Sequence, residues 1–490
     1  MVATGLLVLL SAVSSQAGPA FPVQYSASKR YLVDQTGAPF PIMGRSSWFV
    51  FSLSVSDYRT FLDDTVARGY TAMEISAINH DPRGNHPPFG GNGDLPFLKQ
   101  LSGASWGGSL TPDFTTPNEA YWRFVDEFLA YAESKGILVF MFPAYVGARD
   151  SDQGWMREIV ANGPARMRTY GAWIAARYRN QKNLVWMMGG DKGTAEDPFD
   201  RAQTEVEAAL LGGLKSISTQ RSTLFSAEWA SEAIATDQDA FGASMTLNGA
   251  YSWSGDVNTQ GRRAYAHAPI EPSFLLEEPY DEEGPDGNRV NPSATQPVRR
   301  FQWGGWLSTI GGYISGNGYV WPFRDATWRG WELALRAVLS GDNRMWPFRA
   351  PTWRSHLDTN GSGDMARLNA FIRSVAWYDL VPSGLGGMRS LITVGNTSAR
   401  AADYVPAAAT PDGTLLVAYV PPAHRGAITI DMGAMSGPIR ARWLDPTSGT
   451  YVNSEAGLPG AATRSFVPPG NNSGSAADWV LVLDRTAAAK

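Results

Sequence analysis

The chain has 490 residues, a formal net charge of −5 at neutral pH and no cysteine. The lack of cysteine excludes disulfides, thiolate metal sites and a cysteine nucleophile, and the acidic balance argues against nucleic acid or an anionic membrane surface as a partner. Hydrophobic residues make up 43% and charged residues 18% of the chain, which excludes a disordered protein and allows a sizeable core.

The N-terminal residues resemble an export signal. A short apolar run over residues 6–13 is followed by small residues up to Ala17. The run is too short for a membrane span, which needs about 20 apolar residues. We therefore expect a signal peptide over residues 1–17 and a secreted or periplasmic bacterial protein. A plain N-terminal helix is the alternative, because no Lys or Arg precedes Lys29.

From residue 39 onward, apolar strand-like runs alternate with amphipathic stretches. Strands are predicted at 39–44, 70–78, 137–145, 183–188, 222–228, 243–249, 273–278 and 312–321. Helices are predicted at 57–67, 118–135, 164–179 and 196–218, and residues 79–117 form a long loop rich in Gly, Pro and Asn. Eight such alternations predict a (β/α)8 TIM barrel over residues 22–382. A doubly wound open sheet is the alternative, but no glycine-rich phosphate loop follows the first strand.

After residue 382 the helical periodicity stops. Short apolar runs such as LLVAYV and WVLVLD alternate with turn-forming clusters such as Pro411-Asp412-Gly413. Short strands at regular spacing predict a small all-β sandwich domain over residues 388–490.

Chemistry in such barrels is found at the carboxyl ends of the strands. Asp191 follows the apolar run NLVWMM and two glycines, directly after the fourth predicted strand. It is a candidate catalytic carboxylate, and capping of the next helix is the alternative. Glu277 and Glu278 end the seventh predicted strand, where alternation allows only one of them to face the pocket, and we favour Glu277.

One acid after the fourth strand and one after the seventh suit the cleavage of glycosidic bonds. One carboxylic acid protonates the leaving oxygen, while the other carboxylate attacks the anomeric carbon or activates water. An acid of this kind needs a raised pKa, which a second carboxylate and apolar walls supply.

Several segments carry a family resemblance: GRSSWF, YGAWIAARYRNQKN, NLVWMMGGD, EEPYD and WLDPTSGTY. They resemble the apiosidase-like glycoside hydrolases, in which a (β/α)8 catalytic domain precedes a C-terminal β module described as collagen-binding. The resemblance covers nearly the whole chain after the signal peptide, and the Gly-Gly-Asp motif is its most specific element.

By that resemblance, Asp191 takes the acid/base role and Glu277, placed by the Tyr280-Asp281 pair, becomes the nucleophile of a retaining mechanism. The family has Gly-Asp after the first strand, whereas this chain has Gly44-Arg45. The resemblance therefore implies a glycosidase without implying apiose as its sugar.

Further residues at the predicted strand ends are candidates for substrate binding. They are Trp48, His80, Glu228, Trp229, Tyr251, Trp253, Tyr280 and Trp321. The aromatic residues offer flat faces for sugar rings, with core packing as the alternative. Glu228 is either a third carboxylate in the pocket or a salt-bridged structural acid.

Metal binding is not expected. His80 contacts a sugar hydroxyl or is an ordinary loop histidine, because a metal site with His86 would need a third ligand. We also read the acidic segment 281–288 as a solvated loop, since it lacks the spacing of a calcium-binding EF-hand. No P-loop, dinucleotide fingerprint, HExxH or GxSxG motif is present, and we expect no cofactor.

The sequence thus predicts a secreted, monomeric glycoside hydrolase acting on a plant or bacterial oligo- or polysaccharide, without nucleic-acid or membrane partners. The alternative is a non-catalytic carbohydrate-binding or adhesion protein with a degenerate barrel. Acids at both expected strand ends favour the enzyme. Nothing in the sequence indicates proteolysis of collagen.

Overall fold

The computed structural model describes residues 21–80, 90–107, 110–148, 154–217, 224–283, 297–323 and 353–486. The predicted signal peptide over residues 1–17 lies outside these ranges. Within them, no helix combines the length and the apolar character needed to cross a bilayer. A three-stranded antiparallel sheet precedes the barrel and consists of β1 (Gln24–Tyr25), β2 (Leu32–Val33) and β3 (Pro39–Phe40).

Eight parallel strands form a barrel in the described part of the chain. They are β4 (Ile42–Ser46), β5 (Ala72–Ser76), β6 (Leu138–Phe142), β7 (Leu184–Gly189), β8 (Leu224–Glu228), β10 (Asn248–Tyr251), β11 (Ser273–Glu277) and β12 (Ile310–Ser315). The first strand, β4, pairs in parallel with β5 and with β12. Between β8 and β10, the amides of Thr246 and Leu247 donate to the carbonyl of Phe225. The short strand β9 (Ala233–Ile234) adds antiparallel to β10. The predicted (β/α)8 barrel is confirmed.

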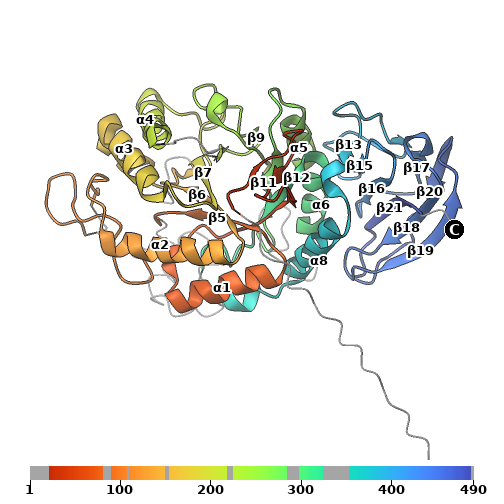
Figure 1. The fold of residues 1–490 in the computed structure, drawn as a ribbon, viewed down its shortest axis with the longest axis horizontal. Coiled ribbons are helices and arrows are strands. Elements are labelled where there is room, and N and C mark those ends of the chain that lie inside the picture. The colour runs from red at the N-terminus through yellow and green to blue at the C-terminus, as the bar shows by residue number, and fades with distance from the viewer. Residues whose placement is uncertain are drawn as a thin grey trace, which may run out of the picture.

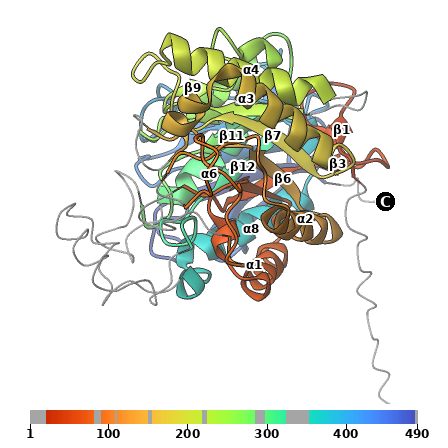
Figure 2. The ribbon, with the colours of Figure 1, turned by 90° about the vertical axis from the view of Figure 1, so that its left-hand side faces the viewer.

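Helices surround these strands (Figures 1 and 2). The described ones are α1 (Val55–Ala67), α2 (Glu119–Ser134), α3 (Met156–Tyr178), α4 (Arg201–Ile217), α5 (Val257–Ala266), α6 (Pro297–Thr309) and α8 (Asn360–Ser374). α3 starts before the predicted residue 164 because it is two helical pieces joined at Gly163, whose φ is 71°. α4 starts later than predicted, because Asp200 caps it by accepting from the amide of Gln203 at 2.8 Å.

Alternation along the strands divides their side chains between two cores. Phe140, Val185, Met187 and Phe274 belong to one buried cluster inside the barrel, whereas neighbours such as Val139 and Trp186 pack with the surrounding helices. Toward the carboxyl ends of the strands, buried polar side chains appear, among them Ser46, Glu74, Glu228 and Glu277. This change places the candidate site at that end of the barrel.

The C-terminal region consists of two antiparallel sheets. The larger contains, in order, β13 (Val381–Pro382), β15 (Ala407–Ala409), β16 (Leu415–Val420), β21 (Trp479–Arg485), β18 (Ile439–Leu444) and β19 (Tyr451–Leu458). The smaller contains β14 (Ile392–Val394), β17 (Ile428–Asp431) and β20 (Thr463–Phe466). Side chains of both sheets share one buried core, which includes Leu416, Ile430 and Trp443. The predicted all-β module is confirmed.

The β module packs beside α6 and α8 (Figure 1). Trp303 of α6 stacks on Tyr419 of β16 with ring centroids 6.0 Å apart and planes 2° apart. Arg299 of α6 makes two hydrogen bonds to Asp478, at 2.7 and 2.8 Å, and one to Asp364 of α8 at 2.5 Å. All three charged side chains are buried. An aromatic stack and a buried ion cluster thus join the two parts of the chain.

Candidate active site

Asp191 reaches the barrel opening through a glycine turn. After β7 the backbone passes through positive φ at Gly189 (76°), Gly190 (122°) and Asp191 itself (56°). A Cβ at Gly189 would lie 2.4 Å from the carbonyl oxygen of Glu228, and one at Gly190 would lie 2.2 Å from the ring of Tyr145. Both positions therefore require glycine. The motif brings the backbone close to two neighbouring strands and leaves the carboxylate at the strand end.

Two phenols hold the Asp191 carboxylate. The Tyr145 hydroxyl donates to Oδ2 at 2.7 Å, and the Tyr251 hydroxyl donates to Oδ1 at 2.8 Å. Burial raises the pKa of Asp191 above its ordinary value, and the two tyrosine hydrogen bonds partly oppose this increase. The alternative of a helix cap is wrong, because α4 begins ten residues later and has Asp200 as its cap.

Glu277 and Glu278 point to different sides of β11. Leu276 lies in the barrel interior with Phe274, so strict alternation would turn Glu278 inward. The pairing of β10 with β11 shifts, however: Ala250 pairs with Leu275, and Tyr251 pairs with Glu277. This bulge places Glu277 on the cavity, whereas Glu278 is fully buried and faces Gln302 of α6.

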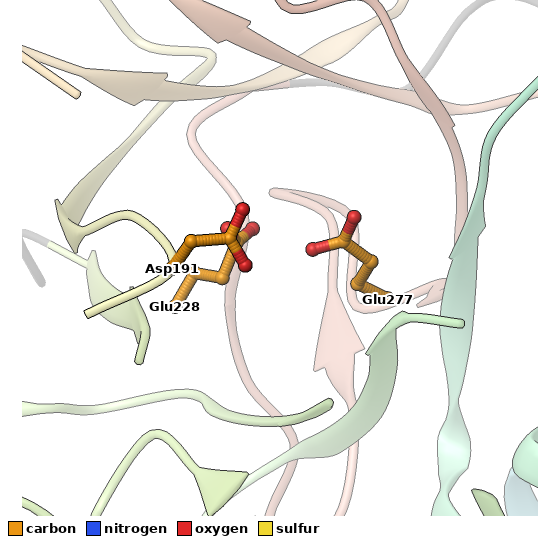
Figure 3. A group of neighbouring side chains, drawn as sticks. All are labelled: Asp191, Glu228 and Glu277. Atoms are coloured by element: carbon orange, nitrogen blue, oxygen red, sulfur yellow. The ribbon is translucent and has the colours of Figure 1, made fainter. Parts of the chain in front are cut away.

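Glu228 ends β8 and lies beside this pair. One carboxylate oxygen from each of Asp191, Glu228 and Glu277 lies within 4.8 Å of the other two. Figure 3 shows Asp191 and Glu228 side by side, with the carboxylate of Glu277 facing them. Glu74 of β5 is also fully buried close by, with Oε2 accepting from the Ser46 hydroxyl at 3.4 Å.

Electrostatics set these carboxyls apart from surface acids. Burial raises the pKa of Glu277, Glu228 and Glu74 well above the ordinary value, and repulsion from neighbouring carboxylates raises each of them further. A hydrogen bond with the Tyr280 hydroxyl lowers the pKa of Glu277 and partly opposes this increase. Several carboxyls close together cannot all be charged in a site of low dielectric, so protons are shared among them.

A cavity of about 360 Å³ opens above Asp191 and Glu277. This volume is within the range of small-molecule sites. Its aromatic walls come from Trp48, Phe49, Tyr145, Tyr251, Trp253, Tyr280 and Trp321. The Trp48 indole N–H donates to the Tyr280 hydroxyl at 3.1 Å, and the Trp253 ring meets Tyr280 edge-on at 5.7 Å. Aromatic walls around a carboxylate pair provide stacking faces for a sugar ring.

Three predicted binding residues, His80, Glu228 and Trp229, do not line this cavity. Glu228 is fully buried beside Asp191 and Glu277. Trp229 is buried in the outer core, where its ring stacks on Phe241 and its indole donates to the carbonyl of Ala235 at 2.8 Å. The reason is alternation: Glu228 points into the barrel, so the next residue points out. His80 pairs with Glu158 at 3.1 Å and lies edge-on to Trp155. His86 lies outside the described residues.

The acidic segment after Tyr280 is not a solvated loop at its start. Asp281, Glu282 and Glu283 are all buried. Asn317 donates to Asp281 and to Glu282, each at 3.0 Å, and the Trp321 indole donates to Glu283 at 2.7 Å. These acids hold the loop after β12 and, with it, the Trp321 wall of the cavity. Residues 284–288 lie outside the described ranges.

Arg45 does not point toward the cavity. Its guanidinium pairs with Asp64 of α1 at 2.7 Å and lies over the ring of Phe61. The neighbouring inward position is Ser46, which contacts Glu74. Position 45 therefore contributes no side chain to the cavity.

Sequence reasoning missed several residues of the site, including Phe49 of the cavity wall and the polar residues Tyr145 and Glu74. Tyr145 could have been predicted, because it is a polar residue at the end of an apolar strand. The same rule selected Asp191. Glu74 had a weaker signal, a lone charge in the strand AMEIS. Its importance depends on facing Asp191 across the barrel, which only the closed sheet reveals.

The carboxylate group is also the place where a metal ion would bind. Among the described residues, Asp191, Glu228 and Glu277 form the group of three acids with ligand atoms close enough to share an ion. Oxygen ligands alone suit a hard cation such as Mg²⁺ or Ca²⁺. Such an ion would bind Asp191 and Glu277 of the cavity together with the buried Glu228, and it would compete with the use of Asp191 and Glu277 in acid–base chemistry.

Comparison with known proteins identifies the family. The family described as "Apiosidase-like, catalytic domain" matches residues 26–379 of the chain. The chain belongs to the apiosidase-like family. Residues 389–484 of this apiosidase-like protein match the "Putative collagen-binding domain of a collagenase". The family and the barrel make it a glycoside hydrolase with a carbohydrate substrate.

Solved structures share the whole architecture. A family 5 glycoside hydrolase from Bacteroides vulgatus aligns with a TM-score of 0.70 at 18% identity, covering 96% of this chain and 95% of the other. A second structure, described as a glycoside hydrolase, aligns with a TM-score of 0.69 at 17% identity, covering 96% and 97%. At these identities the comparison shows the fold. No functionally curated protein matches the chain.

Proposed function

We propose that this enzyme cleaves O-glycosidic bonds in a plant or bacterial oligo- or polysaccharide with retention of configuration, using Asp191 as acid/base and Glu277 as nucleophile. The observation that carries this proposal is the pairing of Asp191 and Glu277 on one cavity, with carboxylate oxygens within 4.8 Å. Retaining enzymes keep the two carboxyls about 5–5.5 Å apart, whereas inverting enzymes leave about 6.5–9.5 Å for a water molecule. The short separation supports retention.

In the first step, Asp191 donates its proton to the oxygen of the leaving group while Glu277 attacks the anomeric carbon. The C–O bond to the leaving group breaks, and a covalent glycosyl–Glu277 ester forms. In the second step, Asp191 accepts a proton from water, which attacks the same carbon and releases Glu277 as a carboxylate. Asp191 is therefore protonated again at the end of the cycle.

The surroundings of each acid suit its role. Asp191 must hold a proton at the working pH, and burial raises its pKa in that direction. Tyr145 and Tyr251 stabilise the carboxylate that remains after proton transfer, which keeps the proton transferable. Trp48, Trp253 and Trp321 supply the stacking faces for the sugar.

The proposal is tested with Asp191→Asn and Glu277→Gln on a panel of glycans and aryl glycosides. We expect Glu277→Gln to lose at least about a thousandfold in kcat on every substrate that the wild type cleaves. Asp191→Asn should keep most of its first step on aryl glycosides whose leaving groups need no protonation. NMR of the first-formed anomer reports retention or inversion.

Several outcomes would contradict this assignment. Full activity in both variants would exclude the pair, and inverted product would exclude a glycosyl–Glu277 intermediate. Binding of glycans by a wild type that cleaves none of them would instead favour a carbohydrate-binding protein. Glu205→Gln is a suitable control, because Glu205 lies on α4 and pairs there with Arg201 at 2.8 Å.

We also propose export to the periplasm or the medium and a monomeric state. Export is supported by the apolar run and small residues in the first 17 positions. N-terminal sequencing of protein from a secreting bacterial host tests it, with cleavage expected after Ala17. Light scattering at micromolar concentration tests the monomer, with an expected mass close to the 53.1 kDa of the chain less its signal peptide.

A further inference from the structure

Glu228 is a buried acid whose oxygens have no partner. Its side chain is 0% exposed, and neither carboxylate oxygen accepts a hydrogen bond from any described residue. The groups that face it are acids and phenols: Glu74, Asp191 and Glu277, with Tyr145, Tyr251 and Tyr280 around them. An ionised carboxylate in these surroundings would lack every form of compensation that buried charges normally receive.

A neutral carboxyl group fits this position. Once protonated, Glu228 carries one O–H donor and needs an acceptor. Both oxygens of Asp191 already accept from Tyr145 and Tyr251. By contrast, Oε2 of Glu277 is buried and accepts no hydrogen bond from a described residue.

We propose that Glu228 is a positioning residue that stays protonated and donates a hydrogen bond to the Glu277 carboxylate. The two side chains offer oxygens within 4.8 Å of each other, and the proposed hydrogen bond requires these oxygens to approach to about 2.5–3.0 Å. Figure 3 shows the carboxyls of Glu228 and Glu277 on opposite sides of the same small space. This inference rests on the proposed role of Glu277 as nucleophile.

The hydrogen bond would solve a problem that the cluster creates. A nucleophile must be ionised, but burial and the neighbouring acids raise the pKa of Glu277 well above its ordinary value. A donor stabilises the charged form of its acceptor, so Glu228 lowers the pKa of Glu277 again. Because Glu228 is neutral, it does so without adding another negative charge beside Asp191.

Two substitutions at position 228 separate this role from the alternatives. Glu228→Gln keeps a donor of similar size and should leave kcat/KM within a few-fold of the wild type. Glu228→Leu removes the donor and should lower kcat/KM about 10- to 100-fold, the usual cost of a hydrogen bond to a charged group. In Glu228→Leu the acidic limb of the pH–rate profile should also move to higher pH, because Glu277 then ionises at higher pH.

Each other outcome would overturn the proposal. Loss of activity in Glu228→Gln equal to that in Glu277→Gln would show that Glu228 must ionise. Unchanged activity in Glu228→Leu would make it a spectator, and lower activity with an unmoved acidic limb would make it only a packing residue. If wild type is inactive, or if Glu277→Gln is active, the proposed function fails instead.

Infrared difference spectroscopy tests the protonation directly and does not depend on activity. The wild type minus Glu228→Gln spectrum at neutral pH should show the C=O stretch of one protonated carboxyl group. A carboxylate band in its place would overturn the proposal even if Glu228→Leu did not fold. Glu207→Gln is the matched control, because Glu207 of α4 is a fully buried acid that does not line the cavity, and its removal should leave the pH–rate profile unchanged.

Discussion

The barrel end and the contact with the β module both bury a group of carboxylates, and they treat the charge in opposite ways. At the contact, Asp364 and Asp478 share the guanidinium of Arg299. At the barrel end, the groups that act on Glu74, Glu228 and Glu277 in the described residues are other acids and hydroxyls. Acids that are paired with a cation hold two parts of a protein together. Acids without a cationic partner instead retain protons that a reaction can use.

Removing the cation at the contact should have the largest effect on stability. Arg299→Met leaves Asp478 buried without its cation and leaves Asp364 with Arg367 alone, which should lower the free energy of unfolding by about 3–5 kcal/mol. Chemical denaturation measures this loss. The pH–rate profile of the folded variant should match that of the wild type, since Arg299 lies outside the cavity. A shifted profile would mean that the two clusters are coupled.

Glu207 of α4 is a buried acid that belongs to neither cluster. It tests whether burial without a compensating cation is enough by itself to make an acid catalytic. Burial raises the pKa of Glu207 from 4.5 to about 8. Between these values the folded protein holds a proton that the unfolded chain has lost, so the free energy of unfolding falls as pH rises through this window. Glu207→Gln should remove this slope and gain about 2–4 kcal/mol at pH 8, with activity unchanged. Denaturation at pH 5 and pH 8 measures the slope, and an unchanged slope would contradict the burial argument.

The tyrosines that bind Asp191 should have a smaller effect, limited to the barrel end. Tyr251→Phe removes the 2.8 Å hydrogen bond to Oδ1, which favours the ionised form of Asp191. The pKa of Asp191 should therefore rise, and the basic limb of the pH–rate profile should move to higher pH. We expect about a tenfold decrease in kcat, measured from steady-state rates between pH 4 and pH 9. A basic limb that moves down would contradict the role of Asp191 as the acid.

The smallest effect is expected behind the cavity wall. Glu232 accepts from the Ser252 hydroxyl at 2.9 Å and from the Ser254 amide at 3.0 Å, and so fixes the loop that carries Trp253. Glu232→Ala should raise KM about three- to tenfold on oligosaccharides and change kcat little, because it loosens a stacking face without touching the acids. Steady-state kinetics measure this split. A main effect on kcat would place Trp253 closer to the reacting bond than we propose.

Local patterns predicted the barrel strands and the helices α1 to α4, with errors at their ends, but they did not predict α5, α6 or α8. The start of α3 was misplaced because a helix broken at Gly163 looks, in sequence, like one that begins at Pro164. The start of α4 was misplaced because Glu196 and Asp197 fit a helical first turn as well as Asp200 does. Both errors arise where a cap or a turn, rather than hydrophobic periodicity, decides the boundary.

The candidate site was predicted only in part, for a different reason. Trp229 and Glu228 are adjacent at a strand end, and the sequence does not say which of the two faces inward. For Glu277 and Glu278, alternation from Phe274 and Leu276 favours the wrong residue, and a bulge against β10 reverses the outcome. A bulge is a property of two paired strands, so neither strand reveals it alone.

By itself, the sequence determined the barrel, the β module and the position of Asp191. Hydrophobic periodicity and the Gly-Gly-Asp turn are properties of short stretches of the chain. They can therefore be recognised from residues that are neighbours in the sequence. Only the tertiary structure decided which acids meet. Closing the barrel brings β5, β7, β8 and β11 together around one space, and that proximity lets burial and neighbouring carboxylates raise the pKa of Glu74, Glu228 and Glu277. Charge interactions depend on the distance between the groups in space, and this distance cannot be read from their spacing along the chain.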